Sequence, residues 1–360
     1  MKKLIIEKEL LIDNINKIKS FTSSSIIAVL KNNGYGLGLD EYPKILLETG
    51  IDFFAVATTE EALTLRKNGF TNKIMLLHSN AVKAEIKQLI DNNIILTIGS
   101  FNSLNALLEV IEDKEIDIQL KLDTGFGRFG FLYNDIPELV KKLKEHSNLN
   151  IIGTFSHFSM SFNPKPEFTK LQFENFNKSI ELLKSENIEL GKLHIANSSA
   201  FLKYKEMHLD CVRVGSAFLG RILVPNELKL KKIAYMESEI EDIKTLPAKH
   251  FIGYSNTFKT KTETKIGIVP VGYLDGFMVA KKNDCFRFND ILREIFNTLK
   301  TFNKKTFVKI GNTFAPVLGK IGTNNITIDL TNIENIETVK LDVNPMYVNP
   351  NIEREFKNPA

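Results

Sequence analysis

Residues 26–36 read IIAVLKNNGYG, which is a short apolar run followed by a lysine and a loop of asparagine and glycine. Such a run is typical of a buried strand. Seven more runs of this kind follow, at residues 53–58, 73–78, 94–98, 116–122, 150–155, 192–196 and 211–214. The segments between them have the apolar spacing of amphipathic helices, at residues 60–68, 82–91, 103–111, 136–146 and 168–184. Eight alternating strands and helices predict an α/β fold, a (β/α)8 TIM barrel over residues 1–235.

The pattern changes in the last third of the chain. Turn-rich segments there join shorter strand-like runs, at residues 266–271, 307–310, 315–318, 326–330 and 340–343. This texture predicts a mostly β C-terminal domain over residues 236–360. A basic helical segment at residues 286–302 predicts a helical insertion near 280–305. We expect the first ten or so residues of the chain to pack with this second domain.

The composition is that of an ordinary globular protein, with 360 residues of which 43% are hydrophobic and 25% are charged. The 47 basic and 43 acidic side chains are spread along the chain, so the net charge of +4 does not favour a nucleic-acid partner. Two cysteines are too few for a disulfide framework or a four-thiolate zinc site. No apolar stretch approaches the ~20 residues of a membrane helix, and the N-terminal apolar run is too short for a signal peptide. We therefore expect a cytoplasmic protein with no metal, membrane or nucleic-acid partner.

Polar residues gather at the carboxyl ends of the predicted strands, where a barrel carries its active site. Lys31 ends the first strand, and a desolvated lysine there could act as an amine nucleophile and form a Schiff base. Taken alone, this position favours an ordinary solvated lysine at a strand end, because lysine side chains are mostly exposed. The other candidates at strand ends are Lys121, Arg128, His157, Asn197, Ser198, Arg213, Gly215 and Ser216.

Several of these candidates are ambiguous singly and informative together. His157 is compatible with a hydrogen-bonded core histidine, and Arg213 with an ion-pair partner of an acidic residue. The turn at Gly215 and Ser216 offers backbone N–H groups where barrels commonly bind phosphate. A Schiff-base lysine, a phosphate site and a histidine that can stack on a ring describe a pocket for pyridoxal 5′-phosphate. The loop after Lys31 fits neither of the glycine-rich nucleotide motifs.

The motifs resemble those of the alanine racemase family. AVLKNNGYG at 28–36 is similar to the family's cofactor-lysine motif, and DTGFGR at 123–128 to its aspartate-threonine-glycine loop. HIANS at 194–198, GYS at 253–255 and PVGYLDG at 270–276 resemble further family motifs in the same order. The resemblance covers nearly the whole chain and includes the predicted β domain.

The resemblance implies an amino-acid racemase that depends on pyridoxal 5′-phosphate and interconverts L- and D-alanine. It implies that Lys31 carries the cofactor and moves a proton on one face of the substrate. Tyr254 from the other subunit of a homodimer would move the proton on the opposite face. Supply of D-alanine as a peptidoglycan precursor for a bacterial cell wall is the role that the resemblance suggests.

The resemblance also assigns supporting residues. Arg213 would face the pyridine nitrogen of the cofactor, and His157 would stack on its ring. Arg128 would steer the substrate carboxylate with support from Lys121, whose family counterpart can be carbamylated. Tyr273 would line the entrance. The phosphate side would be held by Tyr35, Asn197, Ser198, Gly215 and Ser216.

Four positions depart from the family pattern. Thr323 and Asn324 stand where methionine and aspartate are usual, and Thr323 would alter the region around the substrate side chain. Val214 replaces a proline. Phe356 replaces a tyrosine that contacts the phosphate, which removes a hydrogen bond worth roughly 0.5–1.5 kcal/mol unless another group replaces it.

Three alternatives remain open beside alanine racemisation. Serine, or a broader range of amino acids, is an alternative substrate because of Thr323. A pyridoxal-phosphate-dependent decarboxylase of the related barrel fold is disfavoured by Arg213, because such enzymes are expected to place an acidic residue at the pyridine nitrogen. A regulatory barrel that only binds the cofactor is disfavoured by the β domain that carries Tyr254.

Overall fold

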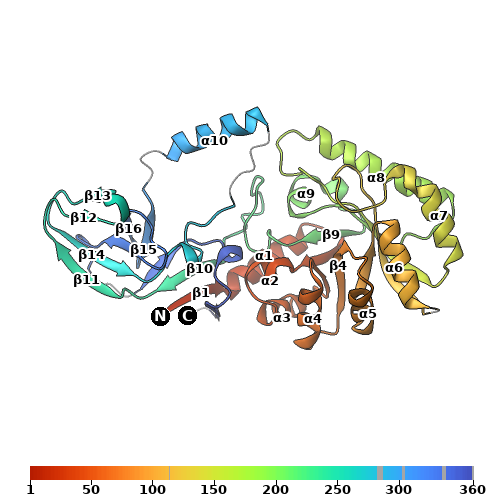
Figure 1. Cartoon of the computed structure of the whole chain (residues 1–360), viewed down its shortest axis with the longest axis horizontal. Coiled ribbons are helices and arrows are strands. Elements are labelled where there is room, and N and C mark those ends of the chain that lie inside the picture. The colour runs from red at the N-terminus through yellow and green to blue at the C-terminus, as the bar shows by residue number, and fades with distance from the viewer. Residues whose placement is uncertain (113, 282–286, 302–304, 335–337, 359–360) are drawn as a thin grey trace. The chain divides into compact units, whose positions relative to one another are not determined.

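A computed structural model describes residues 1–112, 114–281, 287–301, 305–334 and 338–358. The chain divides into two compact units. One unit is Lys8–Ile233, and the other combines Met1–Glu7 with Ala234–Ala360. Figure 1 labels the elements of both units, each of which is described here by itself.

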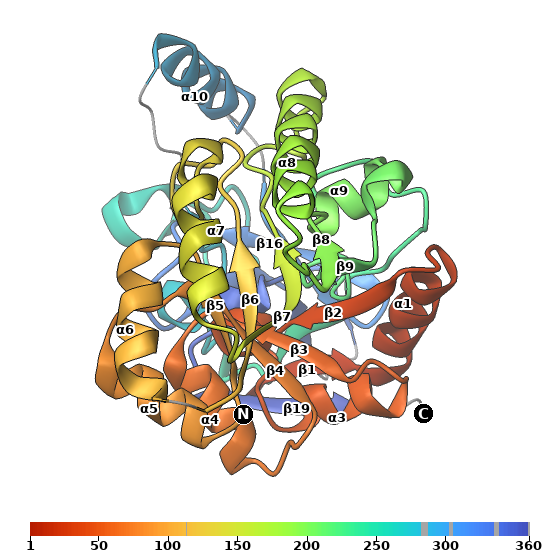
Figure 2. The ribbon, with the colours of Figure 1, turned by 90° about the vertical axis from the view of Figure 1, so that its right-hand side faces the viewer.

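The unit Lys8–Ile233 confirms the predicted (β/α)8 barrel. Its strands pair in parallel in chain order, and the last pairs with the first between Ser25↔Cys211 and Ala28↔Val214, which closes the barrel. Figure 2 shows helices surrounding these strands. The strands are β2 (Ser25–Val29), β3 (Phe53–Val56), β4 (Lys73–Ser79), β5 (Ile95–Ile98), β6 (Ile116–Lys121), β7 (Leu149–Phe155), β8 (Lys192–His194) and β9 (Cys211–Val214).

The longer helices of the barrel bury an apolar face. In α7, for example, Ile136, Leu139, Val140 and Leu143 are buried and recur at helical spacing. Two helices begin at capping boxes, α4 at Thr58 and α6 at Ser100. The helices are α1 (Lys8–Ser20), α2 (Lys31–Tyr35), α3 (Glu41–Glu48), α4 (Thr59–Lys67), α5 (Lys83–Asp91), α6 (Phe101–Ile111), α7 (Ile136–Glu145), α8 (Glu167–Ser185) and α9 (Ser198–Lys203).

The barrel interior is filled by side chains and is not a pore. Alternate strand residues meet in one buried cluster of Ile27, Val29, Ala55, Met75, Ile95, Phe155 and Cys211. Gln119 and His194 are also buried among the strands, and a Cβ at Gly153 would come within 2.5 Å of the Gln119 carboxamide. Glycine at position 153 therefore makes the space that this polar pair needs.

The second unit is mostly β, as predicted. Its main sheet has nine strands in the order β11-β14-β17-β16-β15-β18-β10-β1-β19, and β12 with β13 forms a separate hairpin. The N-terminal strand β1 pairs antiparallel with β10 and parallel with β19. The strands are β1 (Lys2–Glu7), β10 (Ala234–Ser238), β11 (Asp242–Leu246), β12 (Phe251–Ile252), β13 (Phe258–Lys259), β14 (Thr264–Val269), β15 (Phe307–Ile310), β16 (Thr313–Leu318), β17 (Ile326–Asp329), β18 (Val339–Leu341) and β19 (Glu353–Lys357).

One helix, α10 (Phe288–Thr301), lies within the segment for which the sequence predicts an insertion. Residues 282–286 and 302–304 of that segment lie outside the described residues. The helix is amphipathic, and its large apolar side chains are all exposed, namely Phe288, Ile291, Leu292, Ile295, Phe296 and Leu299. In the part of the chain that the structure describes, no helix is long and apolar enough to cross a membrane.

A buried asparagine joins the first helix of the barrel to the chain that leaves the last strand. The Asn14 carboxamide donates to the carbonyls of Phe218 (2.9 Å) and Lys231 (2.8 Å) and accepts from the Lys231 N–H (2.9 Å). Asn14 is fully buried, so no water replaces these bonds when the side chain is removed.

We expect Asn14→Ala to lower the free energy of unfolding by about 2–4 kcal/mol, because it opens a cavity and strands three backbone groups. Urea denaturation followed by circular dichroism measures this loss. The exposed Asn16 on the same helix is the matched control, and Asn16→Ala should stay within about 0.5 kcal/mol of the parent. Equal effects of the two substitutions would contradict this account.

Candidate active site

The backbone after Lys31 adopts an unusual left-handed turn. Asn32, Asn33, Gly34 and Tyr35 have φ values of 55°, 53°, 62° and 55°. The left-handed region costs an L-residue other than glycine roughly 1–2 kcal/mol, so the three non-glycine residues among these four are strained. The turn is closed by hydrogen bonds from the Gly34 N–H to the Leu30 carbonyl (2.8 Å) and from the Gly36 N–H to the Asn32 carbonyl (2.9 Å).

Lys31 itself lies half-buried at the carboxyl end of β2. Burial lowers the pKa of its amine, and the Arg128 guanidinium lowers it further, whereas the Glu61 carboxylate raises it. Its Nζ lies 5.9 Å from the centroid of the Tyr35 ring. A lowered pKa increases the unprotonated fraction of the amine, which is the nucleophilic form.

Tyr35 and the turn after β9 form a compact cradle. A Cβ at Gly215 would come within 2.5 Å of the Tyr35 hydroxyl, so only glycine allows this approach. The Tyr35 hydroxyl bonds to the backbone of Ser216, and burial raises the pKa of Tyr35 to about 12. The Gly215 N–H donates to the Ser198 hydroxyl at 3.1 Å. Four predicted phosphate-side residues are therefore in mutual contact.

Asn197, the fifth predicted phosphate-side residue, caps the helix that follows it. Its Oδ1 accepts from the N–H groups of Ser199 and Ala200, both at 3.1 Å, and from the Ser161 hydroxyl at 2.8 Å. The side chain thereby fixes where α9 begins, directly after β8.

Arg213 is a buried cation, 3% exposed, on β9. Its guanidinium donates to the carbonyls of Ser156 (2.6 Å), His194 (3.1 Å) and Ile195 (3.1 Å). It also donates to the Nδ1 atoms of His194 (2.7 Å) and His157 (3.3 Å). None of these partners is a carboxylate. Burial lowers the pKa of Arg213 to about 9, so the group keeps its charge at neutral pH.

Both histidines beside Arg213 are neutral. Burial and the positive charge of Arg213 hold the pKa values of His157 and His194 well below their usual range. Because each Nδ1 accepts from Arg213, each proton lies on Nε2. The His194 Nε2–H donates to the Gln119 Oε1 at 2.9 Å, and its ring stacks on Phe155 with 5.0 Å between centroids.

Lys121 and Arg128 lie around the same rim. Lys121 is 5% exposed and donates to the Leu77 carbonyl at 3.1 Å. Burial, followed by the charges of Arg213 and Arg128, lowers the pKa of Lys121 to about 7. Arg128 is exposed, and its guanidinium lies 4.3 Å from the centroid of the Phe126 ring. A small cavity of about 10 Å³ lies between Lys121, Arg128, His157 and their neighbours.

The loop that carries Arg128 is organised by Asp123. Its two carboxylate oxygens accept four backbone N–H groups at 2.8–3.2 Å, those of Gly125, Phe126, Gly127 and Arg128. The sequence contains Asp123 within a recognised motif but does not reveal this role. Glu61, Ser156, His194 and Gln119 are further contacts of the site that the strand-end pattern does not single out.

The remaining predicted residues belong to the second unit. Tyr254 lies on the short 3-10 helix η3 (Tyr254–Asn256) after the β12 strand, and it is 71% exposed. Tyr273 lies on η4 (Tyr273–Asp275), and its hydroxyl accepts from the Thr323 hydroxyl at 3.0 Å. The structure therefore brings Tyr273 and Thr323 together within their unit.

Three of the departing positions take ordinary structural places. Val214 is buried on β9. Phe356 lies on β19 opposite Ile6 of β1, at an edge of the nine-stranded sheet. Asn324 is exposed in the turn between β16 and β17.

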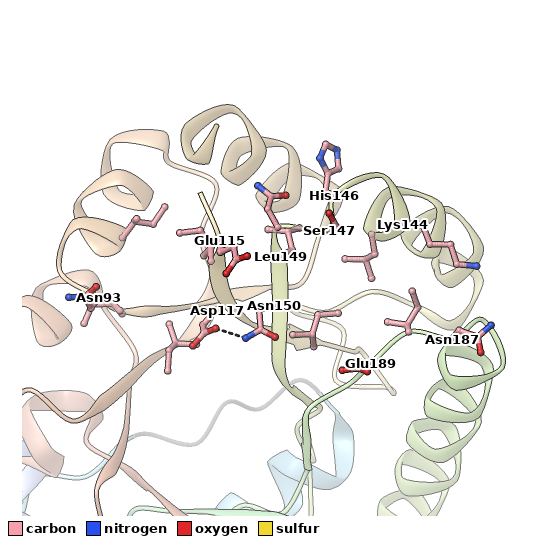
Figure 3. Close-up of a pocket in the computed structure, with 18 residues that line it drawn as sticks. Asn93, Glu115, Asp117, Lys144, His146, Ser147, Leu149, Asn150, Asn187 and Glu189 are labelled. Carbon is pink, nitrogen blue, oxygen red and sulfur yellow. Dashed lines mark hydrogen bonds between the residues drawn. The ribbon is translucent and has the colours of Figure 1, made fainter. Parts of the chain in front are cut away.

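One cavity of the barrel unit lies away from these residues. It measures about 890 Å³ and is lined by the amino ends of β5, β6 and β7 and by the carboxyl ends of α7 and α8. Figure 3 shows its polar lining, in which the Asn150 amide donates to Asp117 at 2.6 Å. No predicted site residue lines it. Among the described residues, no group of three metal-ligating side chains of the His, Cys, Asp and Glu types occurs.

The comparisons with known proteins agree across both units. The family models "Alanine racemase, N-terminal domain" and "Alanine racemase, C-terminal domain" match residues 6–222 and 233–344. An alanine racemase of Methanococcus maripaludis is 33% identical over 90% of this chain and 83% of its own length. Alanine racemase 1 of Caldanaerobacter subterraneus is 29% identical over 90% of this chain and 80% of its own length.

Solved structures share the fold. The alanine racemase from Streptomyces lavendulae superposes with a TM-score of 0.85 at 23% identity, covering 100% of this chain and 97% of that chain. The alanine racemase from E. faecalis gives 0.84 at 24% identity, covering 99% and 98%.

A closed barrel with a desolvated lysine and a buried arginine at its strand ends, joined to a β unit, defines a barrel enzyme of the amino-acid racemase class. The chain belongs to the alanine racemase family.

The depressed pKa of Lys121 predicts a pH-dependent stability. Between its folded pKa of about 7 and its unfolded value of 10.5, the native state binds fewer protons than the unfolded state, so stability rises with pH across this window. Lys121→Met has no such titration. We expect the variant to exceed the parent by about 1–4 kcal/mol at pH 6.5 and by much less at pH 9.5.

Urea denaturation in buffers freed of carbon dioxide measures this difference across the pH range. Lys165→Met, at an exposed lysine in the loop before α8, is the control and should parallel the parent. A constant difference between Lys121→Met and the parent would show that Lys121 is not desolvated.

Proposed function

We propose that this protein interconverts L- and D-alanine with pyridoxal 5′-phosphate as its cofactor, as a homodimer whose active sites are shared between subunits. The observation that carries the proposal is that the carboxyl ends of the barrel strands hold two cations together. Lys31 is a desolvated amine, and Arg213 is a buried guanidinium that has only neutral partners. Family membership and the named relatives support the same activity.

The residues present fit this cofactor. Lys31 offers an amine for its aldehyde, and the turn at Gly215 and Ser216, with the Tyr35 and Ser198 hydroxyls against it, would hold its phosphate. The guanidinium of Arg213 would face the pyridine nitrogen, and His157, which accepts from that guanidinium at 3.3 Å, would lie beside the ring. When bound, the cofactor supplies an electron sink that acidifies the α-hydrogen of the amino acid.

Two groups of the chain would move the proton. Lys31 Nζ accepts or donates it on one face of the substrate, and the Tyr254 hydroxyl from the other subunit does so on the opposite face. Exchange between two groups on opposite faces inverts the α-carbon in either direction. The lowered pKa of Lys31 suits this role because it brings the amine closer to the operating pH.

Arg213 favours racemisation over other outcomes. A guanidinium with a pKa of about 9 stays charged at neutral pH and does not readily give a proton to the pyridine nitrogen. Its neighbours His157 and His194 are neutral and cannot supply one either. Arg213 would thereby leave the cofactor ring a weaker electron sink than a protonated pyridinium, which would favour quick return of the proton over side reactions.

Arg128 and Lys121 would act on the substrate carboxylate. Arg128 is exposed on a loop held by Asp123, so its guanidinium is available to an anion entering the site. Lys121 lies beneath it with a pKa of about 7, so a large neutral fraction is present at physiological pH. A neutral amine is the form that reacts with carbon dioxide, which is consistent with carbamylation of Lys121. We also propose a cytoplasmic location and a role in supplying D-alanine as a peptidoglycan precursor.

Lys31→Ala tests the proposal most simply. We expect it to abolish both the visible absorption of the bound cofactor and racemisation measured by loss of optical rotation. The exposed Lys165→Ala is the matched control and should retain both signals. Survival of both signals in Lys31→Ala would refute the assignment of Lys31.

Tyr254→Phe tests the second proton donor. We expect the variant to bind the cofactor normally and to lose at least about 100-fold in racemisation rate, because a positioned acid-base group contributes ~10²–10⁴-fold. Tyr235→Phe, at a tyrosine on β10, is the control. Unchanged rates in both directions for Tyr254→Phe would end the two-base mechanism.

A comparison of substrates separates the alternatives. We expect L-alanine to racemise faster than L-serine, and L-lysine slowest, by chiral chromatography of the products. Faster turnover of L-serine would favour the serine or broad-range alternative raised by Thr323. Release of carbon dioxide from basic amino acids would favour the decarboxylase.

A further inference from the structure

We propose that Glu61 is a positioning residue for Lys31, because its carboxylate ties the left-handed turn after Lys31 to the neighbouring strand end and is the acidic group that acts on the lysine. The inference rests on the proposed role of Lys31 as the cofactor-bearing amine. It assigns a function to a residue outside the strand-end set that the sequence predicts.

The contacts of Glu61 span two segments of the barrel. Its Oε1 accepts from the N–H of Asn33, in the turn after β2, at 3.0 Å. Its Oε2 accepts from the N–H groups of Ala57 (2.9 Å) and Thr58 (3.3 Å), which follow β3. One carboxylate therefore holds the ends of two adjacent strands in register at the rim of the barrel.

The turn needs such a restraint. Asn32, Asn33 and Tyr35 all have positive φ values, a conformation that L-residues adopt in succession only where the surroundings impose it. Tyr35 is held at the far end of the turn by its bond to Ser216. Glu61 holds the near end at Asn33, two residues from Lys31. Together the two contacts fix the direction in which the Lys31 side chain leaves the strand.

Glu61 also balances the charges around Lys31. The groups that face Lys31 are Arg128 from the loop after β6, His157 after β7, Tyr35 in the turn and Glu61 on α4. Arg128 and burial lower the pKa of Lys31, and the carboxylate of Glu61 opposes them. His157 is neutral, so it does not offset this balance.

Two oxygens accept from three N–H donors, and the two substitutions differ in what they remove. Glu61→Gln removes the charge and keeps an acceptor for only one of the two segments, because its amide end is itself a donor. Glu61→Asp keeps the charge but is one methylene shorter and cannot reach both segments. Glu60→Gln is the matched control, because it removes the same charge from the preceding residue, whose side chain is exposed.

The first measurement reads the Lys31 amine without turnover. Full-length protein freed of its cofactor is mixed with pyridoxal 5′-phosphate, and the appearance of visible absorption is timed across a pH range. The unprotonated amine adds to the aldehyde and a water molecule leaves, so the rate rises as Lys31 loses its proton. We expect the profile of Glu61→Gln to shift to lower pH by about 0.5 to 1 unit, since removal of a nearby anion disfavours the ammonium form. Glu60→Gln should follow the parent.

The second measurement is the pH profile of racemisation by the holoenzymes. The limb governed by Lys31 should move to lower pH in Glu61→Gln, whereas Glu61→Asp should keep its position and lose at least about 10-fold in kcat with little change in KM. Coincident profiles for Glu61→Gln and the parent, in either measurement, would overturn the inference. If Glu61→Gln does not fold, an unchanged kcat in Glu61→Asp would overturn it equally.

These outcomes are distinct from failure of the proposed function. Cofactor uptake that persists in Lys31→Ala would refute the role of Lys31 itself. If Lys31→Ala loses cofactor uptake as expected and the pH profile of Glu61→Gln does not shift, only the role of Glu61 would be refuted.

Discussion

The site depends on a guanidinium that is buried in the barrel without a carboxylate partner. Arg213 is held by three carbonyl oxygens and by the Nδ1 atoms of two histidines. A buried cation of this kind is tolerable only when its hydrogen bonds are satisfied, and here they are satisfied by neutral groups. The positive charge therefore remains available to other groups, and it adds to the effect of burial on the pKa values of His157, His194 and Lys121.

The consequences of that charge extend across the rim. Burial, and after it this charge, lowers the pKa values of His157 and His194, so both stay neutral, and the same two causes in the same order lower the pKa of Lys121. The Nε2–H of His194 in turn donates to Gln119, whose carboxamide occupies the space left by Gly153. A rim rich in unpaired positive charge suits a ligand that carries a phosphate and a carboxylate, because these anions supply the charge that the protein omits.

The carboxylates of the rim serve the backbone more than the cations. Asp123 accepts four N–H groups and shapes the loop of Arg128, and Glu61 accepts three and bridges two strand ends. These two carboxylates thereby fix the positions of the backbone segments that carry Lys31 and Arg128. Among the described residues, they form no ion pair with either cation. Because the carboxylates bind backbone N–H groups, they fix the loops and, in the described part of the chain, leave the nearby cations without an acidic partner.

The sequence predicts the barrel well because the interior strands are continuously apolar, as in IIAVL at 26–30. It does not predict β11, whose residues Asp242–Leu246 are almost all exposed and polar in pattern, or the sheet position of β1, which depends on pairing with distant strands. The strand-end rule identifies Lys31 and Arg213. It misses Glu61, because locally this residue is only the second member of the capping box that Thr58 begins. The same carboxylate also accepts from the Asn33 N–H, but that contact depends on the left-handed turn and is not encoded in the local sequence.

We have proposed that Arg213 keeps the pyridine nitrogen of the cofactor unprotonated. The most direct measurement is the ¹⁵N NMR chemical shift of ring-labelled pyridoxal 5′-phosphate bound to the holoenzyme at neutral pH. The account predicts the shift of an unprotonated pyridine that accepts a hydrogen bond. The shift of a protonated pyridinium would contradict it.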